Sequence, residues 1–191
     1  MTDHEQLVTM LAARSARRGE FTLASGARST LYVDARMTTM SPDGLALIGP
    51  LALSAIDGAG WRPDSAGGLT LGADPISYAI AYASATTRRN PLVRAFTVRK
   101  EAKAHGTGKL IEGPFQSGDR VVVVEDVITT GGSALKAVDA IEAAGGKVVG
   151  VLAVVDREEG GRERIEERGH PVIALARAAE LVEQMERSAT R

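Results

Sequence analysis

Two adjacent carboxylates, Glu125 and Asp126, stand between a run of four valines and a Thr-Thr-Gly-Gly-Ser segment at residues 129–133. A continuous branched apolar run is typical of a strand covered on both faces, and ligands of an open α/β sheet bind outside the carboxyl ends of its strands. Glycines let the backbone approach an anion, and the free amides at the start of the following helix favour negative charge. The pattern predicts a cradle for a phosphate monoester; the alternative is an ordinary capped helix.

The two acids cannot serve the phosphate directly, because carboxylates would repel it. They could accept hydrogen bonds from vicinal hydroxyls, or they could help to hold Mg²⁺. A phosphate cradle beside a group that binds a diol describes a site for ribose 5-phosphate. The sequence lacks both the G-x-x-x-x-G-K-[ST] pattern of a P-loop and the G-x-G-x-x-G pattern of a dinucleotide-binding fold, so neither of those sites is expected.

A second segment, residues 98–113, is rich in cations and glycine and has few apolar anchors. Cations of this kind could neutralise a pyrophosphate leaving group as its charge develops, and a loop that closes over the substrate would exclude water. Taken alone, the segment is more typical of a solvated surface loop. Beside a ribose-phosphate cradle, we favour the catalytic interpretation. The basic residues are Arg99, Lys100, Lys103, His105 and Lys109.

The elements that must position these residues alternate between strand and helix, which predicts a parallel sheet with right-handed crossovers. We expect strands at 69–71, 92–98, 120–124, 147–155 and 171–175, and two short strands around a Ser-Gly turn within 21–36. We expect helices at 3–18, 41–57, 76–86, 133–144 and 178–187.

Length and composition limit the classes of protein to which this chain could belong. A chain of 191 residues suits one domain, and a formal net charge of -1 argues against a broad nucleic-acid-binding face. The chain has no cysteine, which fits the reducing cytoplasm. We expect no membrane span, because no apolar run approaches 18 residues.

The segment VVVVEDVITTGGSA resembles the phosphoribosyl-diphosphate signature of the type I phosphoribosyltransferases. VRKEAKAHGTGKLIEG, at 98–113, is similar to the catalytic loop of the orotate-specific members of that family, and so are FTLASG and DREEGG. The resemblance runs from about Phe21 to about Gly161. It implies an α/β type I phosphoribosyltransferase fold, a central, mainly parallel twisted sheet flanked by helices. It further implies one domain over 1–191, with a small N-terminal hood from about 1–40 plus C-terminal contributions and a core at about 41–175.

The resemblance also implies a reaction: transfer of the 5-phosphoribosyl group from phosphoribosyl diphosphate to orotate, dependent on Mg²⁺, in pyrimidine biosynthesis. The implied protein is a cytoplasmic homodimer whose catalytic loop is shared across the interface, without nucleic-acid or membrane partners. Two alternatives stay open. One is the same chemistry on another base, such as a purine; the other is a regulator that senses phosphoribosyl diphosphate, for which the chain has no spare DNA-binding domain.

The resemblance assigns roles to individual residues. Orotate would be bound by Ser25, Thr129 and Arg157, although Arg157 could instead pair with Asp156 or Glu158. No direct metal ligand is assigned, since Mg²⁺ would be held mainly by the substrate, near Glu125 and Asp126. The catalytic set is Arg99, Lys103, His105 and Asp126. The set for phosphoribosyl diphosphate is Ala73, Asp74, Arg99, Lys100, Lys103, His105, Glu125, Asp126, Val127, Ile128, Thr129, Thr130, Gly131, Gly132 and Ser133.

Two positions depart from the family pattern. Many members carry lysine where this chain has Ala24 and Ala73, so positive charge is missing from the expected site. Arg28, Arg36 or the loop lysines could compensate, the affinity could be lower, or the preferred base could differ. The sequence does not decide among these three.

Overall fold

The sheet that carries the acid pair has six strands in the order β5-β4-β3-β6-β7-β8. The computed structural model describes residues 1–22, 28–87, 89–101 and 110–190. Neighbouring strands run parallel except at the edge, where β5 is antiparallel to β4. The strands are β3 (Ser65–Leu69), β4 (Arg94–Val98), β5 (Ile111–Glu112), β6 (Arg120–Ile128), β7 (Lys147–Asp156) and β8 (Val172–Arg177).

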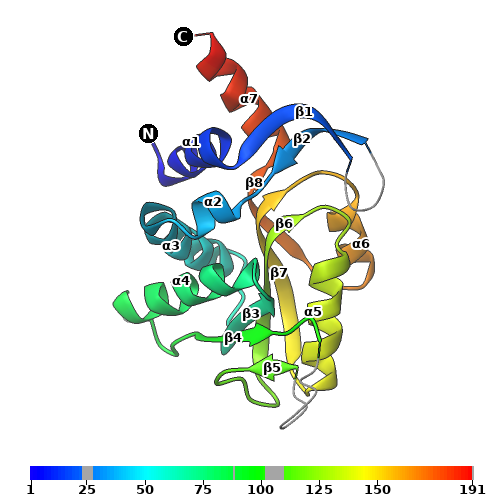
Figure 1. Ribbon diagram of the computed structural model, residues 1–191. Helices are drawn as coiled ribbons and strands as arrows, with labels where there is room; N and C mark the ends of the chain where they lie inside the picture. The colour runs from blue at the N-terminus through cyan, green and yellow to red at the C-terminus, as the bar shows by residue number, and fades with distance from the viewer. Residues whose placement is uncertain (23–27, 88, 102–109, 191) are drawn as a thin grey trace.

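Helices cover both faces of this sheet (Figure 1). On one side lie α3 (Pro42–Gly58) and α4 (Ala73–Thr86), and on the other α5 (Gly132–Ala143) and α6 (Gly161–Glu167). The valines of β6 alternate between the two layers. Val122 and Val124 pack in the core that contains α3 and α4, while Val121 and Val123 pack in the core that contains α5. Burial on both faces explains why the whole run is apolar, as expected from the sequence.

A separate layer sits above the carboxyl ends of the strands, and we call it the hood. It consists of α1 (Asp3–Arg14), an antiparallel hairpin of β1 (Ala16–Thr22) and β2 (Arg28–Val33), and α7 (Ala178–Ala189), which packs against α1. A short helix, α2 (Arg36–Thr39), leads from the hairpin into α3. The side chain of Arg14 donates to both oxygens of the Asp43 carboxylate, at 2.9 and 2.7 Å, and holds the pKa of Asp43 well below its usual range. This pair ties the hood to the first turn of α3.

The fold class is confirmed, and several element boundaries are corrected. The helix expected at 3–18 ends at Arg14, because the basic residues that follow pair with β2 as a strand. The strand expected at 69–71 is β3, and it begins at Ser65. The glycines of β3 allow close packing: a Cβ on Gly67 would lie 2.4 Å from the carbonyl oxygen of Phe96, and one on Gly68 would lie 2.0 Å from that of Val124.

Two short helices, α2 and α6, are not predicted from the sequence because neither is long enough to show a period. The expected start of α3 is confirmed, with Pro42 in the first turn and the Ser41 side chain accepting from the Gly44 amide at 3.2 Å. Among the described residues, no helix is long and apolar enough to cross a membrane.

Candidate active site

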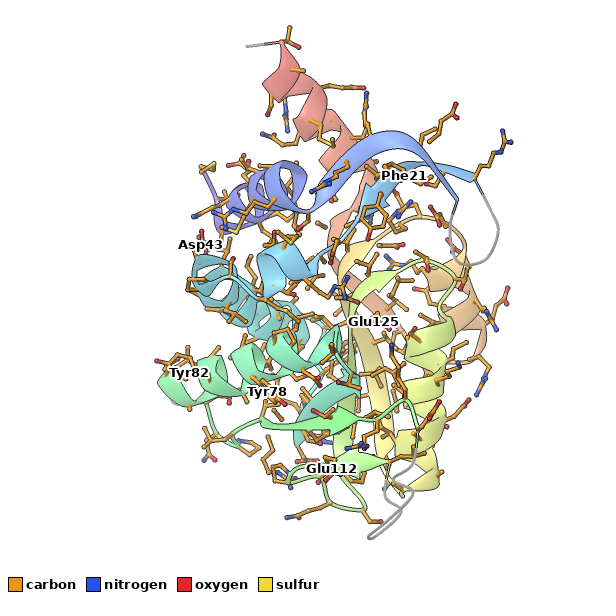
Figure 2. The ribbon with its side chains drawn as sticks, in the orientation of Figure 1. Phe21, Asp43, Tyr78, Tyr82, Glu112 and Glu125 are labelled. Atoms are coloured by element: carbon orange, nitrogen blue, oxygen red, sulfur yellow. The ribbon has the colours of Figure 1, made fainter. Side chains whose placement is uncertain are left out.

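The acid pair lies within strand β6, near its carboxyl end, because β6 continues to Ile128 rather than ending at Val124 (Figure 2 labels Glu125). Glu125 is 6% exposed, and its Oε2 has no hydrogen-bond partner among the described residues. Burial, followed by the neighbouring Asp126 carboxyl group, raises the pKa of Glu125 well above its usual value. A buried, unpartnered carboxyl oxygen at the ligand edge of a sheet is a group that awaits a donor.

Asp126 is half-buried, and its Oδ1 accepts from the Val127 amide at 2.9 Å. Its carboxyl group rests on Gly72, at the start of α4. A Cβ built on Gly72 would lie 2.5 Å from both Cγ and Oδ1 of Asp126. Glycine at position 72 therefore lets the loop after β3 approach the acid pair.

The predicted phosphate cradle is present between β6 and α5. Residues 127–134 and Glu125 line a small cavity of about 40 Å³. Gly131 has φ +74° and stands at the N-cap of α5, where no side chain caps the helix, so the first amides of the helix keep no side-chain acceptor. Such amides are free to bind an anion. The Ile128 side chain is buried in the core, so only its backbone can take part.

A second loop supports the cradle from behind. Gly161 opens α6, and a Cβ built on it would lie 2.3 Å from the carbonyl oxygen of Thr129 and 2.7 Å from the amide nitrogen of Gly131. Arg164, one turn further along α6, donates to the carbonyl oxygen of Thr130 at 3.2 Å. The loop between β7 and α6 is thus in backbone contact with the cradle.

A larger cavity of about 340 Å³ joins these parts. Segments that are far apart in the sequence meet in it: the hood strand β2, the loop after β3, the first residues after β4, the end of β6 and the end of β7. The lining residues are Tyr32, Val33, Asp34, Arg36, Leu69, Thr70, Leu71, Gly72, Lys100, Glu125, Asp126, Val127, Thr129, Ser133 and Arg157.

Arg157 is 5% exposed and ties the hood to the end of β7. Its NH2 donates to Ser29 Oγ at 2.9 Å, to the Leu31 carbonyl oxygen at 2.6 Å and to Glu159 Oε1 at 2.6 Å. The ion pair is with Glu159, so the alternative that Arg157 pairs with Asp156 or Glu158 is wrong. Its Nε is buried and has no partner among the described residues, and the side chain lines the cavity.

A neighbouring cavity of about 620 Å³ holds other predicted residues, and Lys100 lines both cavities. Arg99 lies there, 3.7 Å from Glu112. Asp74 accepts from the hydroxyls of Thr70 at 2.6 Å and Thr97 at 2.8 Å, so its carboxylate already ties α4 to β4. Ala73 is fully buried in the core, and its methyl group does not reach either cavity.

The structure brings together most of the predicted set. The cavity of about 340 Å³ is lined by Glu125, Asp126, Val127, Lys100 and Arg157, and residues 129–133 form the cradle. Predictions for Ala24, Ser25, Lys103 and His105 lie outside the described residues. The sequence also suggests that backbone amides around Gly72 lie at the site, and Gly72 does line the cavity. Sequence reasoning missed Tyr32 and Asp34, because nothing local in the sequence shows that the hood folds over the acid pair.

Magnesium has no complete protein site here. Among the described residues, no group of three or more His, Cys, Asp or Glu could hold an ion by itself. Mg²⁺ usually keeps several waters and takes one or two carboxylates together with substrate phosphates. The Glu125–Asp126 pair, with one unpartnered oxygen, fits that mode.

Comparison with known proteins gives one consistent result. Residues 77–172 match the model of the phosphoribosyl transferase domain. The orotate phosphoribosyltransferase of Aquifex aeolicus is 48% identical over 185 residues, which cover 95% of this chain and 99% of that protein.

Solved structures agree. The orotate phosphoribosyltransferase of Mycobacterium tuberculosis H37Rv, in complex with Fe(III) dicitrate, is 44% identical, with a TM-score of 0.81 over 94% of this chain and 99% of that one. The same enzyme in complex with 5-phospho-α-D-ribosyl 1-diphosphate is 41% identical, with a TM-score of 0.78 over the same shares.

Proposed function

Because this chain belongs to the orotate phosphoribosyltransferase family, we propose that it transfers the phosphoribosyl group from phosphoribosyl diphosphate to orotate. The products are orotidine 5'-monophosphate and pyrophosphate, a step of pyrimidine biosynthesis. The observation that carries the proposal is the cavity in which a helix-start cradle, a buried acid pair and a buried arginine converge.

Different residues bind different parts of phosphoribosyl diphosphate in the proposed mechanism. Amides and hydroxyls of Thr129–Ser133 bind the 5-phosphate, and Glu125 and Asp126 bind the ribose hydroxyls. Glu125 is suited to this, because a carboxyl group whose pKa is raised can be protonated and donate as well as accept. With the diol and phosphate both fixed, the anomeric carbon is held in one orientation, which lowers the entropic part of the barrier.

The leaving group needs cations. As the bond to pyrophosphate breaks, positive charge develops on the sugar and negative charge on the leaving oxygen. Arg99, Lys100, Lys103 and His105 stabilise the departing pyrophosphate in the proposed mechanism. Lys100 has the best-supported place, since it lines the cavity that contains the acid pair. The roles of Lys103 and His105 rest on the family resemblance.

Orotate binds on the side of Arg157 in the proposed arrangement. The orotate carboxylate binds near the Arg157 guanidinium, which lines the cavity, and Thr129 and Ser25 contact the ring. A buried cation at the base side favours an anionic base over a neutral purine, because opposite charges attract more strongly where water is excluded.

Magnesium is proposed as the cofactor, bound between the acid pair and the substrate's oxygens; when bound, it would neutralise phosphate charge. A homodimer is also proposed, with residues 98–113 reaching the partner's site. Tyr78 and Tyr82, exposed on α4 beside the cavity that contains Arg99, suit a subunit contact (Figure 2). We place the protein in the cytoplasm, in keeping with its cysteine-free sequence.

A spectrophotometric assay of orotate consumption tests the activity. With phosphoribosyl diphosphate and Mg²⁺, orotate should disappear and pyrophosphate should form in equal amounts, and chelation of Mg²⁺ should abolish turnover. Adenine, guanine and hypoxanthine should give no product. Pyrophosphate release with a purine and none with orotate would overturn the proposal.

A further inference from the structure

Among the described residues, few cations are available for the diphosphate. Ala73 contributes only a buried methyl group, and the described cations that line the cavity of about 340 Å³ are Arg36, Lys100 and Arg157. Arg157 is committed to the hood residues Ser29 and Leu31 and to Glu159. Arg36 is therefore the one of these three that has no role in the proposed mechanism.

Arg36 is held in a defined orientation by its neighbour Asp34. The Arg36 Nε donates to Asp34 Oδ1 at 2.8 Å and NH2 donates to Oδ2 at 3.0 Å, and the Arg36 amide also donates to Oδ1 at 3.2 Å. The same bonds lower the pKa of Asp34. A two-point pair of this kind fixes the plane of the guanidinium. No described residue accepts from NH1, and the side chain is 48% exposed, so the outer edge of the fork is open to a ligand.

The position of Arg36 indicates which part of the substrate it contacts. The cradle for the 5-phosphate is lined only by Glu125 and residues 127–134, without any hood residue. Arg157 meets the hood at Ser29 and Leu31, several residues before Arg36. Arg36 instead begins α2, which packs on α3, and it shares the cavity with Leu71, Gly72 and Asp126. Lys100, which the proposed mechanism assigns to the departing pyrophosphate, lines the same cavity, so we take this to be the pyrophosphate side of the acid pair.

The electrostatic surroundings of Arg36 agree with its position beside the acid pair. The pKa of Arg36 is raised first by its bonds to Asp34 and also by the charge of Asp126, which puts the guanidinium within electrostatic reach of the acid pair. An arginine that lines the cavity near Asp126 can bind phosphate oxygens through its free edge while Asp34 retains the other edge.

We propose that Arg36, oriented by Asp34, binds the diphosphate group of phosphoribosyl diphosphate and supplies the charge that Ala24 and Ala73 lack. Arg36 is a binding residue for the leaving group, and Asp34 is a positioning residue. The inference rests on the proposed function but adds a cation from the hood, independent of residues 98–113.

Steady-state kinetics of Arg36→Ala test it. The KM for phosphoribosyl diphosphate should rise by about 10- to 100-fold, the usual effect of losing a charge-assisted bond to phosphate, with the KM for orotate changed by less than about twofold. Inhibition shows which phosphate is involved: the inhibition constant of pyrophosphate should rise by a similar factor, while that of ribose 5-phosphate stays near the wild-type value. Arg36→Lys should recover part of the loss, and Asp34→Asn should give a smaller loss of the same kind.

Arg168→Ala is the matched control, because Arg168 is equally exposed at 49% and pairs with Asp139 away from the cavity; its kinetics should equal those of the wild type. Thermal unfolding of each variant separates a binding defect from a folding defect, and Arg36→Gln gives the same comparison if Arg36→Ala folds poorly. An unchanged inhibition constant for pyrophosphate in a folded variant would overturn the inference. Absence of orotidine 5'-monophosphate with the wild-type protein would instead overturn the proposed function.

Discussion

At the scale of single residues, the adjacent acids Glu125 and Asp126 differ in how deeply their carboxyl groups are buried. The carboxyl group of Glu125 is enclosed, with one oxygen unpartnered among the described residues, while Asp126 next to it is half-buried against Gly72. Two neighbouring carboxyl groups of this kind are expected to share charge unevenly, with the more buried one holding its proton. For a diol, one donor and one acceptor side by side are complementary to two hydroxyls.

Glu125→Gln should therefore stabilise the free protein, and more so at higher pH. The folded pKa of Glu125 is raised above the ordinary value of 4.5, so below that value both folded and unfolded chains hold the proton and the wild type has no penalty. As pH rises through and above it, the unfolded chain ionises more readily and the wild type loses stability. Glutamine does not ionise, so its melting temperature should exceed that of the wild type by on the order of 2–4 °C at pH 8.

Differential scanning calorimetry at pH 4.5 and pH 8 measures this difference. Glu183→Gln, on the exposed face of α7, is the control and should show no pH-dependent gain. A constant offset between Glu125→Gln and wild type at both pH values would mean that folding does not raise the pKa of Glu125.

At the scale of elements, the cradle depends on the loop behind it as much as on its own residues. Gly161 lets the first turn of α6 touch the backbone at Thr129 and Gly131, and Arg157 lies four residues earlier in the same connection. The loop between β7 and α6 thus contributes to both the phosphate-binding side and the base-binding side of the site. A small shift of α6 should therefore change the geometry of both sides.

Gly161→Ala should weaken binding of the 5-phosphate without unfolding the protein. Gly161 does not need a positive φ, so alanine suits the helix, and the penalty comes from the methyl group that would press on the cradle backbone. We expect the inhibition constant of ribose 5-phosphate to rise roughly tenfold or more, since a displaced binding loop is costly.

Gly58→Ala is the matched control, because a Cβ at Gly58, the last residue of α3, would meet nothing within 4 Å. It should bind ribose 5-phosphate as the wild type does and be slightly more stable, by about 0.4–1 kcal/mol. Equal binding by Gly161→Ala and Gly58→Ala would show that the contact behind the cradle does not matter.

At the scale of the whole molecule, the site is divided between the sheet, the hood and a loop that is proposed to come from a partner. The hood is joined to the core by Arg157 at the cavity and by the Arg14–Asp43 ion pair at its far side, while the Arg18–Glu186 ion pair joins β1 to α7 within the hood. Exposed pairs of this kind contribute little each, so Arg157, which is buried, is the tie that couples the hood to the ligand edge.

Mixing two inactive variants tests the shared loop. Lys103→Ala removes a loop cation, and Asp126→Asn damages the acid pair, so each homodimer should be nearly inactive. If residues 98–113 act on the partner's site, refolding the two chains together gives mixed dimers in which one of two sites is intact, and about a quarter of the wild-type activity should return for random pairing.

Subunit exchange without denaturant is the control for refolding, and sedimentation velocity establishes that dimers are present. No recovery in a mixture of confirmed dimers would mean that the loop serves its own subunit, because each site would then carry one defect.

The sequence by itself determined the chemistry at the strand end. The local sequence is enough to predict this chemistry. Strand burial, close backbone approach and free helix-start amides follow from the type and order of the four valines, the two acids and the Thr-Thr-Gly-Gly-Ser segment. The same holds for the alternation of elements that predicts a parallel sheet, and for the capped start of α3.

Only the tertiary structure decided what surrounds that strand end. Arg36, Asp34 and Tyr32 come from the hood, about ninety residues before the acid pair, and Gly72 comes from the loop after β3. Whether Arg157 pairs with Glu159 or its immediate neighbours, and whether the Asp74 carboxylate faces a ligand or two threonine hydroxyls, depends on which side chains the fold brings within 3 Å. Residue order alone does not select among such partners, because side-chain directions and the approach of distant residues such as Thr97 to Asp74 are set by the fold.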